Sequence, residues 1–152
     1  MTERSVAHGT FVVDRTYKHP VEKVWAAWSD MDKKYGWFGD PGSTQKPDIF
    51  DFRTGGRESS RGEIHGGPTY NFDVTYQDIV PLSRIVYNYD MHLDGRKISV
   101  SLAAIEFFPA PGGTRCKITE YGLFLDGLDT NAQREGGTKV LMDQLEAWLD
   151  TN

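Results

Sequence analysis

Period-two alternation of apolar and polar residues is the feature that most limits what this chain can fold into. It runs through four stretches, residues 69–79, 84–93, 97–108 and 114–124. Alternation of this kind is typical of β-strands that bury one face. Short segments rich in Gly, Pro and Asp separate the stretches, as in turns between antiparallel strands. With further alternation from about residue 47, the pattern predicts a meander of about six antiparallel strands.

Each predicted strand has one face that we expect to point into the protein. The assignment follows from the two-residue repeat of side-chain direction along a strand. In the third stretch the phase slips near Ala103 and Ala104, which indicates a β-bulge there. The residues expected to share the inward faces are Tyr70, Phe72, Val74 and Tyr76; Ile85, Tyr87, Tyr89, Met91 and Leu93; Ile98, Val100 and Leu102; and Cys116, Ile118 and Glu120.

Further elements flank the meander. A first strand, with Phe11 and Val13 on one face, ends before Pro20, which suits the first turn of a helix. A short helix follows, then a second over roughly residues 31–36, and a long helix begins at about Asn131. The apolar residues at helical spacing are Val21, Val24, Trp25 and Trp28 in the first helix and Val140, Leu141, Leu145, Trp148 and Leu149 in the last.

This order of elements predicts an α+β fold. We expect a curved antiparallel sheet of about six to seven strands wrapped round the long C-terminal helix, with the two short helices at one end. No linker or repeat interrupts the sequence, so residues 1–152 are predicted to form a single domain. A sheet wrapped round one helix rarely closes completely, and the pattern therefore also predicts a cavity between the two.

Charge and composition exclude several classes of protein. The formal net charge is −5 and the Lys and Arg residues are scattered, which argues against a nucleic-acid-binding surface. No apolar run is long enough to span a membrane. The N-terminal sequence MTERSVAHGTFVV is too polar for a signal peptide, so a cytoplasmic location is expected. The single cysteine, Cys116, cannot form an internal disulfide or a cysteine metal cluster.

Several short motifs occur together in a fixed order. They are PVEKVWAAWSD, WFG, FDFRTGGRE, EYGLF and GGTKVLMDQL. In this order the chain resembles the SRPBCC superfamily of START-like, Bet v-like helix-grip proteins. Within it, the chain is most similar to the family named for homology to the activator of heat-shock protein 90 ATPase. The resemblance covers nearly the whole chain and implies a deep hydrophobic pocket between sheet and long helix. Members of the superfamily include lipid carriers, aromatic cyclases and hormone receptors.

The co-chaperone that gives the family its name is larger than this chain. Its separate N-terminal domain makes much of the chaperone contact, and the 152 residues leave no room for such a domain. Co-chaperone activity is therefore not expected to carry over.

Aromatic residues supply most of the candidate ligand-binding positions. Core packing also explains any one of them, but a tyrosine hydroxyl needs a hydrogen-bond partner when buried, which favours a pocket wall with polar tips. The candidates are Trp25, Trp28, Trp37, Phe38, Phe50, Phe52, Tyr70, Phe72, Tyr87, Tyr89, Met91, Phe124 and, as the polar member, Glu120.

Glu120 has the parity of an inward residue, and a buried carboxylate requires a partner or a raised pKa. Arg57 is a candidate partner. Glu120 either anchors a polar group of a ligand or acts as an acid or base, or it has a structural role, as part of an ion pair or at the rim of the sheet. The structural role is the favoured interpretation. Cys116 on the same face is interpreted as a small core residue and not as a nucleophile.

The sequence lacks the usual catalytic and cofactor motifs. No HExxH, Walker, GxSxG or GxGxxG pattern is present, so no cofactor or metal is expected. The four histidines stand far apart and are predicted to be exposed. Gly136-Gly137 is either a loose turn before the last helix or a gap between helix and sheet that admits a ligand.

Three hypotheses about function follow. The leading one is a binding domain that holds a small hydrophobic or amphipathic molecule, such as a lipid, in the cavity. The second is a cyclase- or hydrolase-type enzyme that uses the same cavity, for which only Glu120 and the tyrosines offer an acid or base. The third is a chaperone-interaction protein that uses its surface. Edge strands could also support a homodimer.

Overall fold

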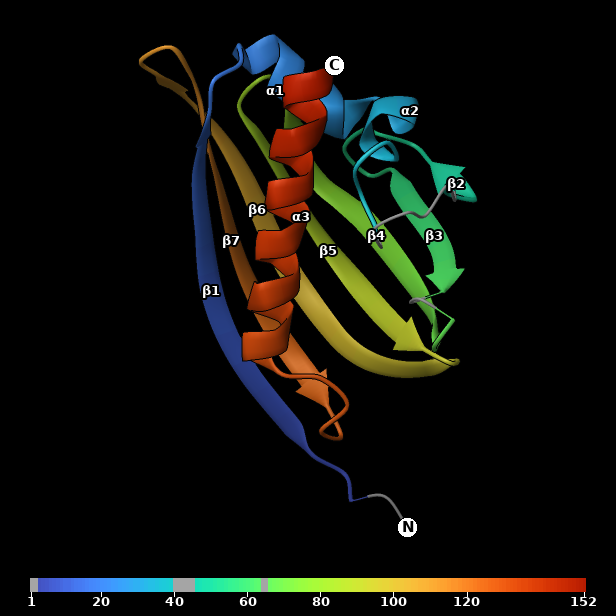
Figure 1. Cartoon of the computed structure of the whole chain (residues 1–152). Coiled ribbons are helices and arrows are strands. Elements are labelled where there is room, and N and C mark those ends of the chain that lie inside the picture. Colours follow the sequence, from blue (N-terminus) through green and yellow to red (C-terminus); the bar gives the residue numbers. More distant parts are fainter. Residues whose placement is uncertain (1–2, 40–45, 64–65) are drawn as a thin grey trace.

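The computed structural model describes residues 3–39, 46–63 and 66–152. Within them the chain forms a curved, antiparallel, seven-stranded sheet in the order β1-β7-β6-β5-β4-β3-β2 (Figure 1). Apart from β1, neighbouring strands follow one another in sequence, as short turns between strands require. The strands are β1 (Val6–Tyr17), β2 (Ile49–Phe50), β3 (Arg57–Glu63), β4 (Thr69–Val80), β5 (Arg84–Leu93), β6 (Arg96–Ala110) and β7 (Gly113–Leu125).

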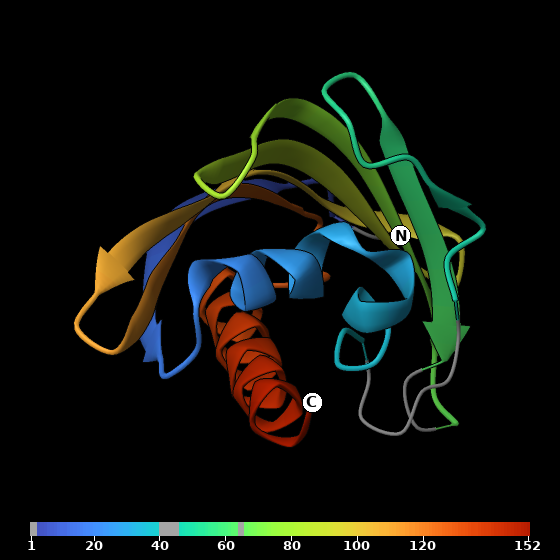
Figure 2. The same cartoon turned by 90° about the horizontal axis from the view of Figure 1, so that it is seen from above.

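Three helices complete the described structure: α1 (Val21–Ser29), α2 (Met31–Lys34) and α3 (Asn131–Thr151). Helix α3 lies in the concave side of the sheet, and α1 and α2 cross one end of it (Figure 2). The predicted α+β helix-grip architecture is therefore confirmed. None of the described helices is long and apolar enough to cross a membrane.

Side-chain caps fix where the helices begin. The Asp30 carboxylate accepts a hydrogen bond from the backbone N–H of Lys33 and starts α2. The Thr130 hydroxyl does the same for Gln133 at the start of α3. Gly136 and Gly137 lie inside α3, so the interpretation of this pair as a turn before the helix is wrong.

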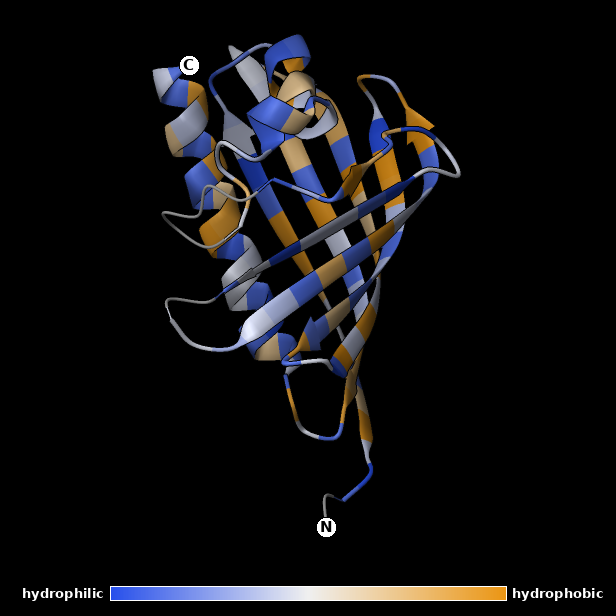
Figure 3. Ribbon diagram, turned by 90° about the vertical axis from the view of Figure 1, so that its right-hand side faces the viewer, coloured by the Kyte–Doolittle hydropathy of each residue, from blue (hydrophilic) through white to orange (hydrophobic). Residues whose placement is uncertain are grey.

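The predicted inward faces are confirmed in β4, β5 and β7, and in β1 the buried face is the one that carries Phe11 and Val13. Apolar and polar residues alternate visibly along these strands (Figure 3). The residues that are buried as expected include Phe11, Val13, Phe72, Val74, Tyr76, Ile85, Tyr89, Cys116, Ile118 and Glu120.

Strand β6 corrects the prediction. Met91 lies opposite Ser99 and His92 lies opposite Lys97, so Ile98 is an extra residue that forms a bulge. The phase of β6 changes at this bulge and not near Ala103, because the pairing with β7 is regular from Ser99 onward. Val100 and Leu102 therefore point outward, and the Leu102 side chain is 49% exposed. The buried residues in their place are Ser99, Ser101, Ala103, Ile105 and Phe107.

The expectation that all histidines are exposed is only partly correct. His8 is exposed, whereas His65 lies outside the described residues. His19 is partly buried, and its Nε2 lies 2.8 Å from a carboxylate oxygen of Asp150. His92 is half-buried and its Nδ1 has no partner among the described residues. In the described chain no group of three His, Cys, Asp or Glu residues could hold a metal ion.

Candidate functional site

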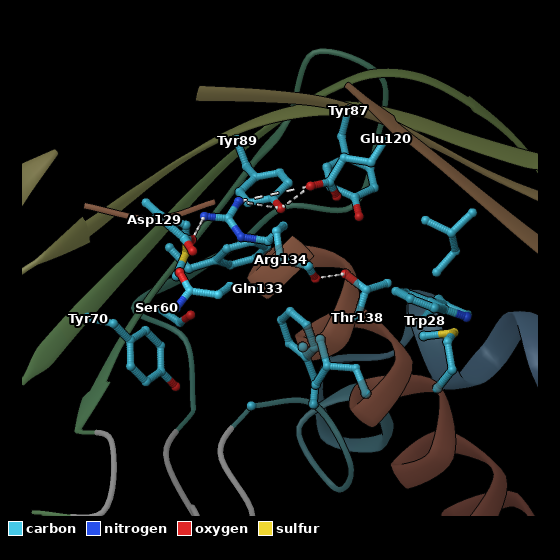
Figure 4. Close-up of a pocket in the computed structure, with 18 of the residues that line it drawn as sticks. Trp28, Ser60, Tyr70, Tyr87, Tyr89, Glu120, Asp129, Gln133, Arg134 and Thr138 are labelled. Atoms are coloured by element: carbon cyan, nitrogen blue, oxygen red, sulfur yellow. Dashed lines mark hydrogen bonds and ion pairs between the residues drawn. The ribbon is translucent and has the colours of Figure 1, made fainter. Parts of the chain in front are cut away.

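A cavity of about 320 Å³ lies between the concave face of the sheet and α3 (Figure 4). Its walls come from β3, β4, β5, β7, α1, α3 and the segments after α2 and β7. Among the residues that line it, Gln133 and Gly137 are exposed on α3, so the cavity reaches solvent beside the helix. Its size falls in the range of small-molecule sites.

Eight of the candidate positions lie on this cavity wall. They come from α1, the segment after α2 and three strands, which the fold brings together although they are distant in sequence. These residues are Trp28, Phe38, Tyr70, Phe72, Tyr87, Tyr89, Met91 and Glu120.

Three other candidates, Trp25 of α1 and Phe50 and Phe52 in and after β2, pack together and do not line the cavity. Trp25 meets Phe52 edge-on at 5.8 Å between ring centroids, and Phe107 in the same way at 5.2 Å. Phe50 stacks on Phe52 at 6.3 Å. These rings join the first helix to the sheet, so their role in the structure is packing.

Trp37 and Phe124 also lie outside the cavity wall. Trp37 is buried, meets Trp28 edge-on at 4.8 Å and donates its indole N–H to the carbonyl oxygen of Ala27. Phe124 is 1% exposed and lies 5.5 Å from the guanidinium carbon of Arg134. Trp37 thus packs against Trp28 and Phe124 against Arg134, and both of these partners line the cavity.

Glu120 is buried at one end of the cavity, as its parity predicts. The Tyr89 hydroxyl donates a hydrogen bond of 2.8 Å to its Oε2, and Nη1 of Arg134 lies 3.9 Å from the same oxygen. Arg57, the expected partner, is exposed on β3. The prediction of Arg57 is therefore wrong, and the cation comes from α3.

Arg134 is the main site residue that the sequence did not predict. Its Nη1 donates to the Tyr89 hydroxyl at 2.9 Å and to Ser101 at 3.4 Å. Its Nη2 donates to Ser99 at 2.7 Å and to the Asp129 carboxylate at 2.8 Å. Because Ser99 and Ser101 face inward only as a result of the bulge at Ile98, sequence parity alone could not find this network.

Burial shifts the ionisation of the polar groups at this end. It raises the pKa of Glu120 above its ordinary value, although the Tyr89 hydrogen bond and the Arg134 charge oppose that shift. Burial, and then the nearby Glu120 charge, raise the pKa of Tyr87 well above its usual range. Both groups are thus biased toward their neutral forms.

A second polar network closes the other side of the cavity. Nζ of Lys34 lies 2.8 Å from Oε1 of Glu58, and both side chains are almost fully buried. The hydroxyls of Tyr35 and Tyr76 also donate to this carboxylate. Lys34 lies over the ring of Phe38 at 4.5 Å. This network fixes α2 against β3 and holds the rings at that side of the cavity.

Cys116 does not take part in either network. It is 1% exposed, and burial raises the pKa of its thiol to about 12. A neutral, enclosed thiol is a poor nucleophile, so these properties favour its interpretation as a core residue.

Comparison with known families agrees with this geometry. The family model described as activator of Hsp90 ATPase homolog 1-like protein matches residues 18–150. The chain belongs to this family. The predicted SRPBCC-type relationship is therefore confirmed, together with the helix-grip fold of such members. No significant match to a curated protein was found.

Solved structures of similar proteins include two from rhizobia. An uncharacterized protein from Rhizobium leguminosarum is 38% identical to the present chain, with a TM-score of 0.91. The match covers 99% of the present chain and 100% of the Rhizobium leguminosarum chain. The Mll3558 protein from Rhizobium loti is 41% identical with a TM-score of 0.85 and coverages of 95% and 99%. DynU16, from the dynemicin biosynthetic locus, is 19% identical, with a TM-score of 0.69. The match covers 93% of the present chain and 47% of the DynU16 chain, and it shows a shared fold.

Proposed function

We propose that this protein binds a small, mainly apolar molecule in the cavity between the sheet and α3. The observation that carries the proposal is the cavity of about 320 Å³ itself, enclosed by aromatic rings and bordered at one end by the Glu120 network. Apolar walls with a few convergent polar groups are typical of small-molecule sites.

The inner surface of β6 explains why space is available. Strand β6 lies between the wall strands β5 and β7, and its buried residues Ser99, Ser101 and Ala103 are small. Opposite them, the first two turns of α3 contain no large apolar residue, and Gly137 leaves open space beside the helix. An apolar ligand would fill this space and stabilise the folded state by mass action.

Two neighbouring glycines provide a matched test. A Cβ atom added to Gly136 or to Gly137 would meet nothing within 4 Å, but only Gly137 lines the cavity. Leucine at either position should be tolerated, because it favours the helix by roughly 1 kcal/mol relative to glycine. We expect Gly137→Leu to weaken binding of the uncharged dye N-phenyl-1-naphthylamine at least about tenfold, with Gly136→Leu close to the wild type.

Dye fluorescence, titrated with wild-type and variant protein, measures this effect. Circular dichroism and thermal melting verify that both variants are folded. Equal dye binding by the two variants, or no binding by the wild type at high protein concentration, would contradict a ligand site in this cavity.

A further inference from the structure

Glu120 and Tyr87 lie in one row across the concave face of the sheet. Tyr87 on β5 pairs with Ala103 on β6, and Ala103 pairs with Glu120 on β7. The methyl group of Ala103 is too small to separate the two longer side chains. Figure 4 shows both at the same end of the cavity, and the Glu120 charge contributes to the shifted pKa of Tyr87.

Each of these residues keeps an unused hydrogen-bonding position. Oε2 of Glu120 receives the Tyr89 hydroxyl, whereas Oε1 has no partner in the described part of the chain. The Tyr87 hydroxyl also has no partner among residues 3–39, 46–63 and 66–152. Both residues line the cavity, so a ligand in it lies beside both side chains.

The charge balance of the cavity favours a cation over an anion. The lining residues include two carboxyl groups, Glu120 and Asp129, and one cation, Arg134. The Nη hydrogens of Arg134 are occupied by Tyr89, two serines and Asp129, as described above. An anionic ligand would therefore find no free Nη hydrogen on Arg134, whereas a cationic ligand beside Glu120 would favour the ionised form of that carboxyl group and oppose the effect of burial.

Aromatic rings add to this preference. A cation within about 6 Å of a ring face is attracted by the ring quadrupole. Such contacts already occur on rings of the cavity wall, for example Lys34 over Phe38 at 4.5 Å and Arg134 over Tyr89 at 5.5 Å. Tyr87 and Trp28 offer further rings on the wall.

We propose that the ligand is an amine, with an apolar body among the rings and a protonated amino group held between Oε1 of Glu120 and the Tyr87 hydroxyl. This assignment rests on the proposed function, since it needs the cavity to bind a small molecule. It separates the ligand from fatty acids and other apolar carboxylates, which share the apolar body but carry the opposite charge.

Three probes with a common body test the assignment. Naphthylethylamine, naphthylethanol and naphthylacetic acid are titrated by calorimetry at neutral pH. A charge-assisted hydrogen bond contributes about 1.5–3 kcal/mol, so we expect the amine to bind at least about tenfold more tightly than the alcohol, and the acid to bind most weakly. Glu120→Gln should remove the preference for the amine over the alcohol, which is measured as the ratio of the two affinities in the same variant.

Tyr87→Phe provides a second variant, which loses no hydrogen bond among the residues that the structure describes. It should weaken amine binding about three- to tenfold. If the alcohol binds but the amine is no tighter, or if Glu120→Gln keeps the preference, the amine assignment is wrong and the cavity proposal stands. If none of the three probes binds, both proposals are wrong.

Discussion

At the scale of single residues, the site depends on a buried arginine. Arg134 connects the start of α3 to the sheet through two serines, a tyrosine and Asp129, and its side chain is only 11% exposed. Taking such a cation out of water is costly, and its partners offset the cost only together. Arg134 therefore fixes the helix above the cavity as well as the charge within it.

This dependence predicts a large loss of stability in Arg134→Met. The variant leaves Asp129 without its 2.8 Å ion pair and Glu120 without a neighbouring cation, and removal of one partner from a buried pair costs about 3–5 kcal/mol. The control is Arg61→Met, because Arg61 forms an ion pair of 3.0 Å with Asp48 that is exposed on both sides. That substitution should cost less than about 1 kcal/mol.

Urea denaturation of both variants at neutral pH measures the difference. A free energy of unfolding for Arg134→Met within about 1 kcal/mol of the Arg61→Met value would show that the network contributes little to stability.

Glu120 and Arg134 show what could be predicted from the sequence and what could not. The inward position of Glu120 follows from the two-residue repeat of a regular strand, and it was predicted correctly. Its partner was not, because the apolar spacing that predicts α3 lies in the helix's C-terminal half and says nothing about the direction of Arg134. Val140, assigned to that apolar face, is in fact 50% exposed, and Met142 is buried instead.

At the scale of elements, β6 has an inverted pattern. Its buried residues between β5 and β7 are the small Ser99, Ser101 and Ala103, and its outward residues include the exposed Leu102. The parity prediction failed for residues 99–102 because one extra residue, Ile98, changes the phase earlier than expected. The two serines that this change turns inward are the ones that bind Arg134.

Two adjacent substitutions test this inversion. Ser101→Leu puts a large side chain on the buried face of β6 against Arg134, which lines the cavity, and this should cost about 1–3 kcal/mol and weaken dye binding. Leu102→Ser lies on the outer face and should change stability by no more than about 0.5 kcal/mol. If Leu102→Ser proved the more destabilising, the inward face of β6 would be the one that parity predicts. Thermal denaturation measures the stability of the two variants, and dye titration measures their binding.

At the scale of the whole molecule, α3 divides the concave side into two parts. Its C-terminal half buries Met142, Leu145 and Leu149 against the sheet near α1. Its N-terminal half spans the cavity and contacts the sheet through the Arg134 network. The order of elements and the closed end were predictable from periodicity, whereas the cavity depends on the bulge and on the direction of polar side chains, which periodicity does not reveal.

Trp28 and Trp25 allow the central claim to be tested directly, because they stand in the same helix but only Trp28 lines the cavity. The measurement is solution NMR of the assigned tryptophan indole N–H signals during titration with naphthylethanol. We expect the Trp28 signal to shift saturably while the Trp25 and Trp148 signals stay in place. Saturable shifts of Trp25 or Trp148 with an unchanged Trp28 signal would place the ligand elsewhere and contradict the account.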